Sequence, residues 1–106
     1  MQSMDENEKH YRVVISQHAN GRMWKHFYFL ARVSEKAAEQ MLNTMLKDIR
    51  SLETLPMRNP FYESSYLPEN KYRYLLSAQR YRIVYFIEKA ESTVYVEDIE
   101  DCRQSY

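Results

Sequence analysis

The stretch KYRYLLSAQRYRIVYFI, residues 71–87, decides the fold because it predicts a β-hairpin. Aromatic and β-branched residues fill both halves, and Ala78-Gln79 between them is short enough for a two-residue turn. Successive side chains of a strand point to opposite faces, so this turn divides the hairpin into two sets. One face is expected to carry Arg73, Leu75, Ser77, Arg80, Arg82 and Phe86. The other is expected to be the core face, with Tyr72, Tyr74, Leu76, Tyr81, Ile83, Tyr85 and Ile87.

The residues before the hairpin predict one strand and two helices. Residues 10–15 are β-branched and aromatic, which suits a strand with Tyr11, Val13 and Ile15 on one face. Ser16 and Ser34 suit helix N-caps, because a serine hydroxyl accepts a hydrogen bond from the first helical turn. Apolar residues then recur at three- and four-residue steps: Ala19, Met23, Phe27, Leu30 and Ala31 in the first helix, and Ala38, Met41, Leu42, Met45, Leu46, Ile49 and Leu52 in the second. With only a short break between them, the helices are expected to form an antiparallel hairpin.

Residues 55–70 form a long connection between the second helix and the β-hairpin. It contains three prolines, and Phe61, Tyr62 and Tyr66 are expected to pack it down. Strands are expected at about 71–77, 80–87 and 93–99. The element order predicts an α+β fold, β-α-α-β-β-β, in which the helical hairpin packs on one face of a mostly antiparallel four-stranded sheet. We expect a flexible tail over residues 1–9 and a single domain over residues 10–106.

Composition narrows the classes of function. The chain has 106 residues and a single glycine, Gly21, so it lacks the glycine-rich loops that hold phosphates or dinucleotides. Fifteen basic and fifteen acidic residues balance, so attraction to nucleic acid would need a local patch. The single cysteine excludes an internal disulfide, and the first residues lack the apolar core of a signal peptide. A cytoplasmic protein without a membrane segment is expected.

Neither a metal nor a cofactor is expected. His10, His18 and His26 are spaced eight residues apart, which is not the spacing that places two metal ligands together on a helix. The lone Cys102 cannot build a zinc cluster, and we expect it to be a half-buried, inert thiol. The histidines are expected to lie at the surface or to be partly packed.

Charge is strongly divided within the C-terminal half. Residues 71–82 hold no acid and four cations, which are Lys71, Arg73, Arg80 and Arg82, whereas residues 88–101 hold six acids and one lysine. Two interpretations are open. The arginines could bind phosphates bidentately while neighbouring tyrosines stack on bases. Alternatively, they form a solvated face paired with Glu97, Asp98 or Glu100.

Two segments are specific enough to suggest a family, namely Leu52-x-x-x-Pro56-x-Arg58 and Tyr81-Arg-Ile-Val-Tyr85. Weaker matches are the opening strand at 11–16, the helical hairpin, Tyr72-Arg-Tyr-Leu-Leu76, Val94-Tyr-Val96 and the closing residues 101–106. Together these segments resemble the RelE/ParE superfamily of toxins from type II toxin–antitoxin systems, a family also tied to plasmid stabilisation. The resemblance implies the same fold as the element order.

The resemblance implies two kinds of activity. RelE-like members are ribosome-dependent mRNA endonucleases (mRNA interferases) that cut without a metal by using the 2′-OH. On this chain their catalytic roles would fall to Arg73, Arg82, Arg103 and Tyr106, and their RNA-binding roles to Lys71, Tyr72, Arg80 and Tyr81. ParE-like members instead inhibit DNA gyrase by binding it.

Three departures from the family pattern keep the activity open. Leu75 lies where a second RelE-type lysine is expected, Asp101 and Cys102 replace basic residues, and the chain is neutral. The alternatives are a RelE-like mRNA interferase, a ParE-like gyrase inhibitor, and a toxin-fold binding module that has lost activity. The implied partners are a cognate antitoxin and either mRNA on the ribosome or DNA gyrase. A homodimer and a toxin–antitoxin hetero-oligomer both stay open.

Overall fold

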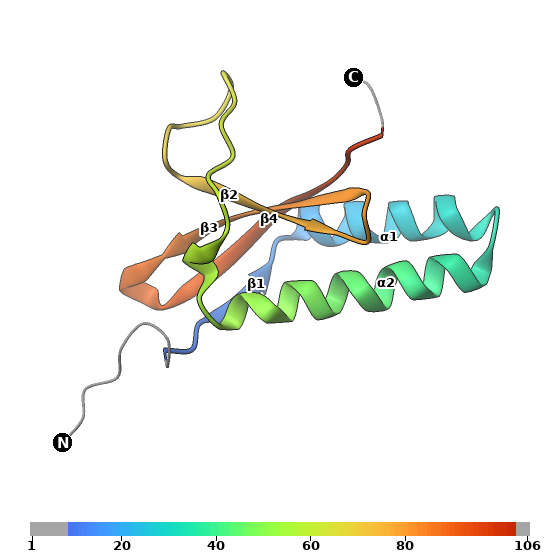
Figure 1. Ribbon diagram of the computed structural model, residues 1–106, viewed down its shortest axis with the longest axis horizontal. Helices are drawn as coiled ribbons and strands as arrows, with labels where there is room; N and C mark the ends of the chain where they lie inside the picture. The colour runs from blue at the N-terminus through green and yellow to red at the C-terminus, as the bar shows by residue number, and fades with distance from the viewer. Residues whose placement is uncertain (1–8, 104–106) are drawn as a thin grey trace.

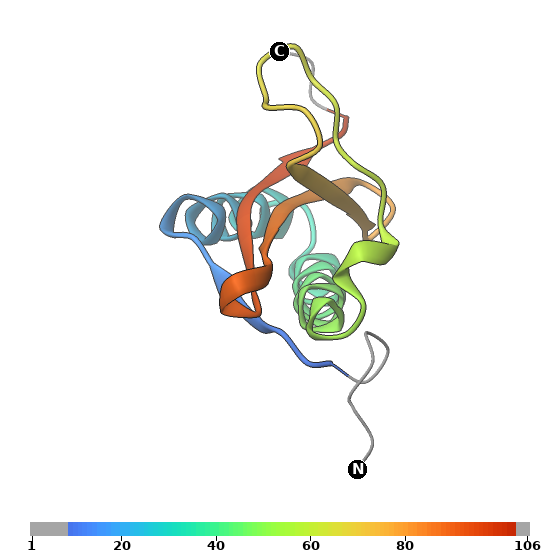
Figure 2. The same cartoon turned by 90° about the vertical axis from the view of Figure 1, so that its left-hand side faces the viewer.

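The computed structural model describes residues 9–103, in the expected order of elements (Figure 1). The elements are β1 (Arg12–Ile15), α1 (Gln17–Ala31), α2 (Glu35–Arg50), β2 (Tyr72–Ser77), β3 (Tyr81–Glu88) and β4 (Thr93–Asp101). The strands form one sheet in the order β1-β4-β3-β2, with β1 parallel to β4 and the other pairs antiparallel. Figures 1 and 2 show the two helices side by side against one face of this sheet. The predicted α+β fold is confirmed.

Two predictions concern the ends of the chain and its relation to membranes. The expected tail lies outside the described residues, except for Lys9. Between residues 9 and 103, no helix is long and apolar enough to cross a membrane.

Both long helices begin where the serine caps predict. Ser16 Oγ accepts a hydrogen bond from the Ala19 N–H at 3.0 Å, and Ser34 Oγ accepts one from the Ala37 N–H at 3.1 Å. The apolar stripes then face the sheet, so the methionines of α2 belong to the core. Its buried members include Ala19, Met23, Met41, Met45 and Ile49 from the helices, and Ile83, Tyr85, Val94, Val96 and Ile99 from the sheet.

The β2–β3 hairpin has the predicted turn but not the predicted register. Ala78 and Gln79 both have positive φ, 51° and 61°, as in a two-residue type I′ turn. Ser77 nevertheless pairs with Tyr81, so Arg80 is an extra residue between the turn and the ladder. Because side chains alternate along a strand, this one insertion reverses the face on which each β2 residue lies relative to β3.

The predicted division of the hairpin into two faces is therefore wrong. The face under the helices carries Arg73, Leu75, Ser77, Tyr81, Ile83, Tyr85 and Ile87. The opposite face, called the open face below, carries Tyr72, Tyr74, Leu76, Arg82, Val84 and Phe86. Arg73 and Arg82, which were expected to share a face, lie on opposite faces of the sheet.

The Leu52-x-x-x-Pro56-x-Arg58 segment fastens the chain after α2 to the core. Leu52 and Pro56 are buried, and Leu55 between them turns the chain through a left-handed conformation, with φ of 50°. The Arg58 guanidinium donates to the carbonyls of Thr54 at 2.7 Å and Leu55 at 3.0 Å. The segment therefore has a structural role, because its arginine satisfies backbone carbonyls that follow the helix.

Three other side chains differ from expectation. His26 on α1 is buried, with Nε2 2.7 Å from the Ile99 carbonyl of β4. Because a carbonyl only accepts hydrogen bonds, Nε2 is the donor, and His26 fastens α1 to β4 beyond Val96, where the pairing with β1 ends. Cys102 is exposed rather than half-buried. Tyr66 is 93% exposed and does not pack the 55–70 connection down.

The buried Tyr85 hydroxyl joins β3 to this connection. It donates to the Pro56 carbonyl at 2.5 Å and accepts from Asn59 Nδ2 at 2.9 Å. Tyr85→Phe leaves both groups without this partner and is expected to lower the free energy of unfolding by about 1–3 kcal/mol. Urea denaturation measures the loss, with Tyr66→Phe as the control at an exposed ring. Equal stability of the two variants would mean that the hydroxyl contributes nothing.

Candidate functional site

An arginine on the open face lies between two tyrosines and a carboxylate. Arg82 comes from β3, Tyr74 from β2, Glu100 from β4 and Tyr62 from the 55–70 connection. The Arg82 Cζ lies 4.8 Å from the Tyr62 ring centre and 5.7 Å from that of Tyr74. Its Nη1 donates to Glu100 Oε1 at 3.0 Å and to the Tyr62 hydroxyl at 3.2 Å. We call these four residues the Arg82 cluster.

Electrostatics keep Arg82 charged and the Tyr62 phenol neutral. Burial alone would lower the pKa of Arg82, but the hydrogen bond to Glu100 and the neighbouring Tyr62 outweigh burial and raise it. Burial, and then the charge of Glu100, raise the pKa of Tyr62, so this phenol stays protonated near neutral pH. The cluster thus combines a fixed cation, an acid side chain and a neutral hydroxyl. Such groups suit proton transfer and charge stabilisation at a phosphodiester.

A second group of side chains crosses the same open face, and we call it the aromatic row. It consists of Tyr72 of β2, Phe86 of β3 and Tyr95 of β4, with Lys71 above them. The Phe86 and Tyr95 rings are stacked with centres 5.1 Å apart, and Tyr72 meets Phe86 edge-on at 5.7 Å. The Lys71 Nζ lies 4.7 Å from the Phe86 ring centre and 5.2 Å from that of Tyr72. Two predicted RNA-binding residues, Lys71 and Tyr72, therefore lie together.

Arg73, predicted to be catalytic, lies on the helix side of the sheet, where its guanidinium is hydrogen-bonded to backbone carbonyls. Its Nη1 donates to the carbonyls of Met57 at 3.1 Å and Asn59 at 2.6 Å. Its Cζ also lies 3.9 Å from the ring centre of Phe61. These contacts hold the connection after α2 in place. Arg73 also lines a cavity of about 400 Å³ whose other lining residues include Lys71, Ile87 and Lys89.

Three more predicted site residues, Arg80, Tyr81 and Arg103, lie at the turn end of the hairpin. Arg80 donates through Nε and Nη2 to the two oxygens of the buried Asp101, at 2.9 and 2.7 Å. Tyr81 is 3% exposed, so its ring is not available for stacking on a base. Arg103 is exposed and lines, with Arg80, a hollow of about 300 Å³ beside the helical hairpin. Tyr106, also predicted to be catalytic, lies outside the described residues.

The sequence predictions missed several members of the two open-face groups. The expected pairing of the arginines with acids is right for Arg82 and Glu100, but Asp101 was not considered as a partner of Arg80. Phe86 was expected on the same face as Arg82 but was given no site role, Tyr62 was expected only to pack the 55–70 connection, and Tyr95 was given no role. For Phe86 and Tyr95 the signal is the alternation of side chains along their strands, and Tyr72 joins them only when the extra residue at the turn is known.

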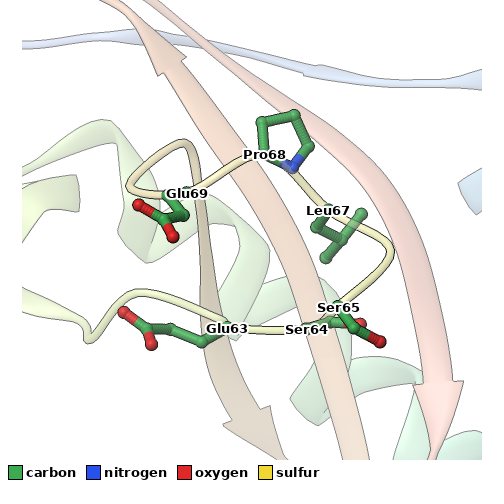
Figure 3. A pocket seen from close by; sticks show the side chains of 6 residues that line it. All are labelled: Glu63, Ser64, Ser65, Leu67, Pro68 and Glu69. Atoms are coloured by element: carbon green, nitrogen blue, oxygen red, sulfur yellow. The ribbon is translucent and has the colours of Figure 1, made fainter.

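A hollow of about 320 Å³ in the 55–70 connection is acidic and contains none of the predicted site residues. It is lined by Glu63, Ser64, Ser65, Leu67, Pro68 and Glu69. Figure 3 shows the two carboxylates on opposite arms of the loop. In the described part of the chain, no group of three His, Cys, Asp or Glu side chains could hold a metal ion. Because the carboxylates of Glu63 and Glu69 would repel a phosphate, the open face is the better candidate for phosphate chemistry.

Comparison with known proteins identifies the fold. No protein-family model and no curated protein sequence matches the chain. Solved structures do match: the chromosomal ParDE toxin–antitoxin system of P. aeruginosa has 9% identity and a TM-score of 0.69, over 86% of this chain and 95% of that one. The toxin–antitoxin complex RelBE2 of Mycobacterium tuberculosis has 15% identity and a TM-score of 0.66, over 92% and 97%. The chain therefore has the RelE/ParE toxin fold.

The Arg80–Asp101 pair should make stability depend on pH. The hydrogen bond from Arg80 lowers the pKa of Asp101 below its usual value. A lowered folded pKa stabilises the protein above the usual Asp pKa of about 3.9, and this contribution is lost as the pH falls through the folded value. Asp101→Asn should lower the free energy of unfolding by about 1–3 kcal/mol near neutral pH.

The difference between Asp101→Asn and the parent protein should shrink towards zero in strong acid, where Asp101 is protonated in both states. Urea denaturation over a pH series measures it, with the exposed Glu39→Gln as the control. A difference that does not change with pH would exclude this linkage.

Proposed function

We propose that this chain is the toxin of a type II toxin–antitoxin system and that it cuts mRNA on the ribosome in the cytoplasm. The observation that supports this reading is the Arg82 cluster on the open face of a RelE/ParE toxin fold. In the cluster, the Arg82 cation lies within hydrogen-bonding distance of both a carboxyl group and a protonated phenol. A cognate antitoxin is the partner that would neutralise it.

Cleavage would proceed by attack of the 2′-oxygen on the adjacent phosphorus. Glu100 accepts the 2′-OH proton, Tyr62 donates a proton to the leaving 5′-oxygen, and the products are a 2′,3′-cyclic phosphate and a 5′-hydroxyl. Arg82 stabilises the charge that develops on the phosphoryl oxygens. Its hydrogen bonds to Glu100 and Tyr62 both use Nη1, which leaves Nη2 and Nε to reach the phosphate. Arg73 positions the connection that carries Tyr62, while Arg103 and Tyr106 stay predicted contributors.

Dependence on the ribosome follows from the charge balance. The chain is formally neutral, and Arg80 and Arg82 are paired with acids, so a free RNA gains little from phosphate attraction. A ribosome would supply the missing affinity by presenting the mRNA in a fixed geometry.

Removing the guanidinium should stop the reaction. Arg82→Ala is expected to lower the rate of mRNA cleavage on stalled ribosomes by at least about 100-fold, as for loss of a group that stabilises the transition state. Arg82→Lys keeps a positive charge at this position and tests whether lost cleavage reflects a defect in folding. Arg50→Ala on α2 is the control at an exposed arginine. Cleavage by Arg82→Ala at the parental rate would remove this mechanism.

A second candidate, non-enzymatic inhibition of DNA gyrase, is favoured by the outer surface of α1. Trp24, Tyr28 and Phe29 are 38%, 63% and 54% exposed, and Val33 after the helix is 82% exposed. Residues 17–31 contain no acid. Exposed aromatic side chains of this kind mark protein-contact surfaces, and the basic surroundings favour an acidic partner segment. An antitoxin peptide could use the same surface.

The gyrase candidate predicts a loss of inhibition when the α1 surface changes. Tyr28→Ser should weaken inhibition of supercoiling about 30-fold, the effect of losing a contact worth about 2 kcal/mol. Leu46→Ser, at a 37%-exposed position on α2, is the matched control. Absence of inhibition by micromolar parent protein would reject this candidate. Growth arrest on expression without an antitoxin would reject the third alternative, a module that has lost toxicity.

A further inference from the structure

We propose that the aromatic row stacks the bases of single-stranded RNA next to the Arg82 cluster. The proposal rests on the proposed nuclease function and deepens it, because it adds a subsite that holds bases to the site that acts on the phosphate. The subsite consists of Tyr72, Phe86 and Tyr95, with Lys71 as its cation. It gives the RNA a path across the open face, from the aromatic row to the Arg82 cluster.

The row is a continuous surface built from three neighbouring strands. Phe86 is the cross-strand partner of both Tyr72 on β2 and Tyr95 on β4. The Phe86 and Tyr95 ring planes differ by only 23°, so the two rings form one stack. The Tyr72 ring meets Phe86 edge-on, with an angle of 83° between the ring planes. The Tyr95 hydroxyl is held by Glu91 Oε1 at 2.5 Å, which restrains the ring at the outer end. Rings fixed in this way lose little freedom when a base stacks on them.

The row lies on the same face as the reacting groups. Phe86 follows Arg82 by four residues on β3, which is about 13 Å at the rise of about 3.3 Å per residue in a strand. Bases of a stacked single strand are about 3.4 Å apart, so an RNA of a few nucleotides would reach from the row to Arg82. Val84 lies between them on the open face, and the carboxylate of its β4 partner Asp98 is partly offset by Arg22, whose Nε lies 3.7 Å away.

Lys71 shows that the Phe86 ring can accept a ligand on its face. Its ammonium already lies over this ring and over Tyr72. An exposed cation–π contact is weaker than the stacking of a base on an aromatic ring, so a base can displace the ammonium. The freed Lys71 then pairs with a phosphate of the same strand.

The chemistry of the row points to unpaired bases of any sequence. Stacking uses the π-face that every base has, and no side chain of the row reads the edge of a base. A duplex buries its base faces and could offer only phosphates. The row therefore fits single-stranded RNA, such as an mRNA codon and its neighbours.

Direct binding tests this subsite without depending on cleavage. The full chain carrying Glu100→Gln is titrated against a fluorescent single-stranded RNA of about eight nucleotides, within the range of known stacking sites. Phe86→Leu and Tyr95→Leu remove a ring and keep an apolar side chain, and each should weaken binding about tenfold, equal to about 1.4 kcal/mol. Phe86→Tyr keeps the ring and should bind normally, and Tyr95→Phe, which keeps the ring but loses the bond to Glu91, should bind more tightly than Tyr95→Leu. Tyr66→Leu, at an exposed ring outside the row, is the control.

An abasic strand of the same length separates stacking from attraction to phosphates. We expect it to bind far more weakly than the ordinary strand. Three results would each overturn the subsite. The abasic strand binds as tightly as the ordinary strand, duplex RNA binds as tightly as single-stranded RNA, or both leucine variants keep the parental affinity and melting temperature. Ring-dependent binding supports the subsite even when the parent protein fails to cut mRNA on ribosomes, which counts against the nuclease alone. If the parent protein cleaves mRNA but the leucine variants bind RNA as tightly as the parent, only the subsite is rejected.

Discussion

The hydrogen bonds of Arg80 determine which way the β2–β3 hairpin faces. Its carbonyl accepts from the Cys102 N–H at 2.8 Å and its guanidinium holds Asp101 through two bonds, so the residue stays outside the β2–β3 ladder. A register shift of one residue moves every side chain of a strand to the other face of the sheet. This anchor therefore sets Arg73 of β2 on the helix side, opposite to Arg82 of β3. The different surroundings of the two arginines, with Arg82 on the open face and Arg73 bound to backbone carbonyls, depend on it.

The same charge pairs that hold the sheet would limit how strongly the proposed site on the open face attracts a phosphate. A guanidinium that already has an acid partner attracts distant phosphates weakly, yet it is held in a fixed orientation. Arg82 is such a guanidinium. Glu100 and Tyr62 hold its orientation, and the Glu100 carboxylate partly neutralises its charge. In the proposed reaction, affinity for RNA would then have to come from the aromatic rings or from a larger assembly that presents the substrate. The proposed nuclease would therefore be weak on RNA away from that assembly.

Sequence reasoning located the elements well because their signals are local. The serine caps and the apolar stripe of α2 depend on residues within a few positions, and the structure has both. The register failed because it depends on a pair, Arg80 with Asp101, separated by 21 positions in the chain. His26 could have been found, since it follows the buried Met23 by three residues on the core side of α1. The Tyr62–Arg82 contact had no local signal, because the sequence of a long connection contains no periodic pattern that predicts where it packs.

The connection after α2 also covers the outer edge of β2. The Tyr62 N–H donates to the Tyr72 carbonyl at 2.6 Å, and the Tyr74 N–H donates to the Pro60 carbonyl at 3.2 Å. Phe61 bridges to Arg73 in the antiparallel sense. An uncovered edge strand is a template on which other chains can pair and aggregate. Residues 60–62 therefore protect the sheet from edge-to-edge association, and a partner that adds a strand alongside Tyr72–Tyr74 must first peel this segment away.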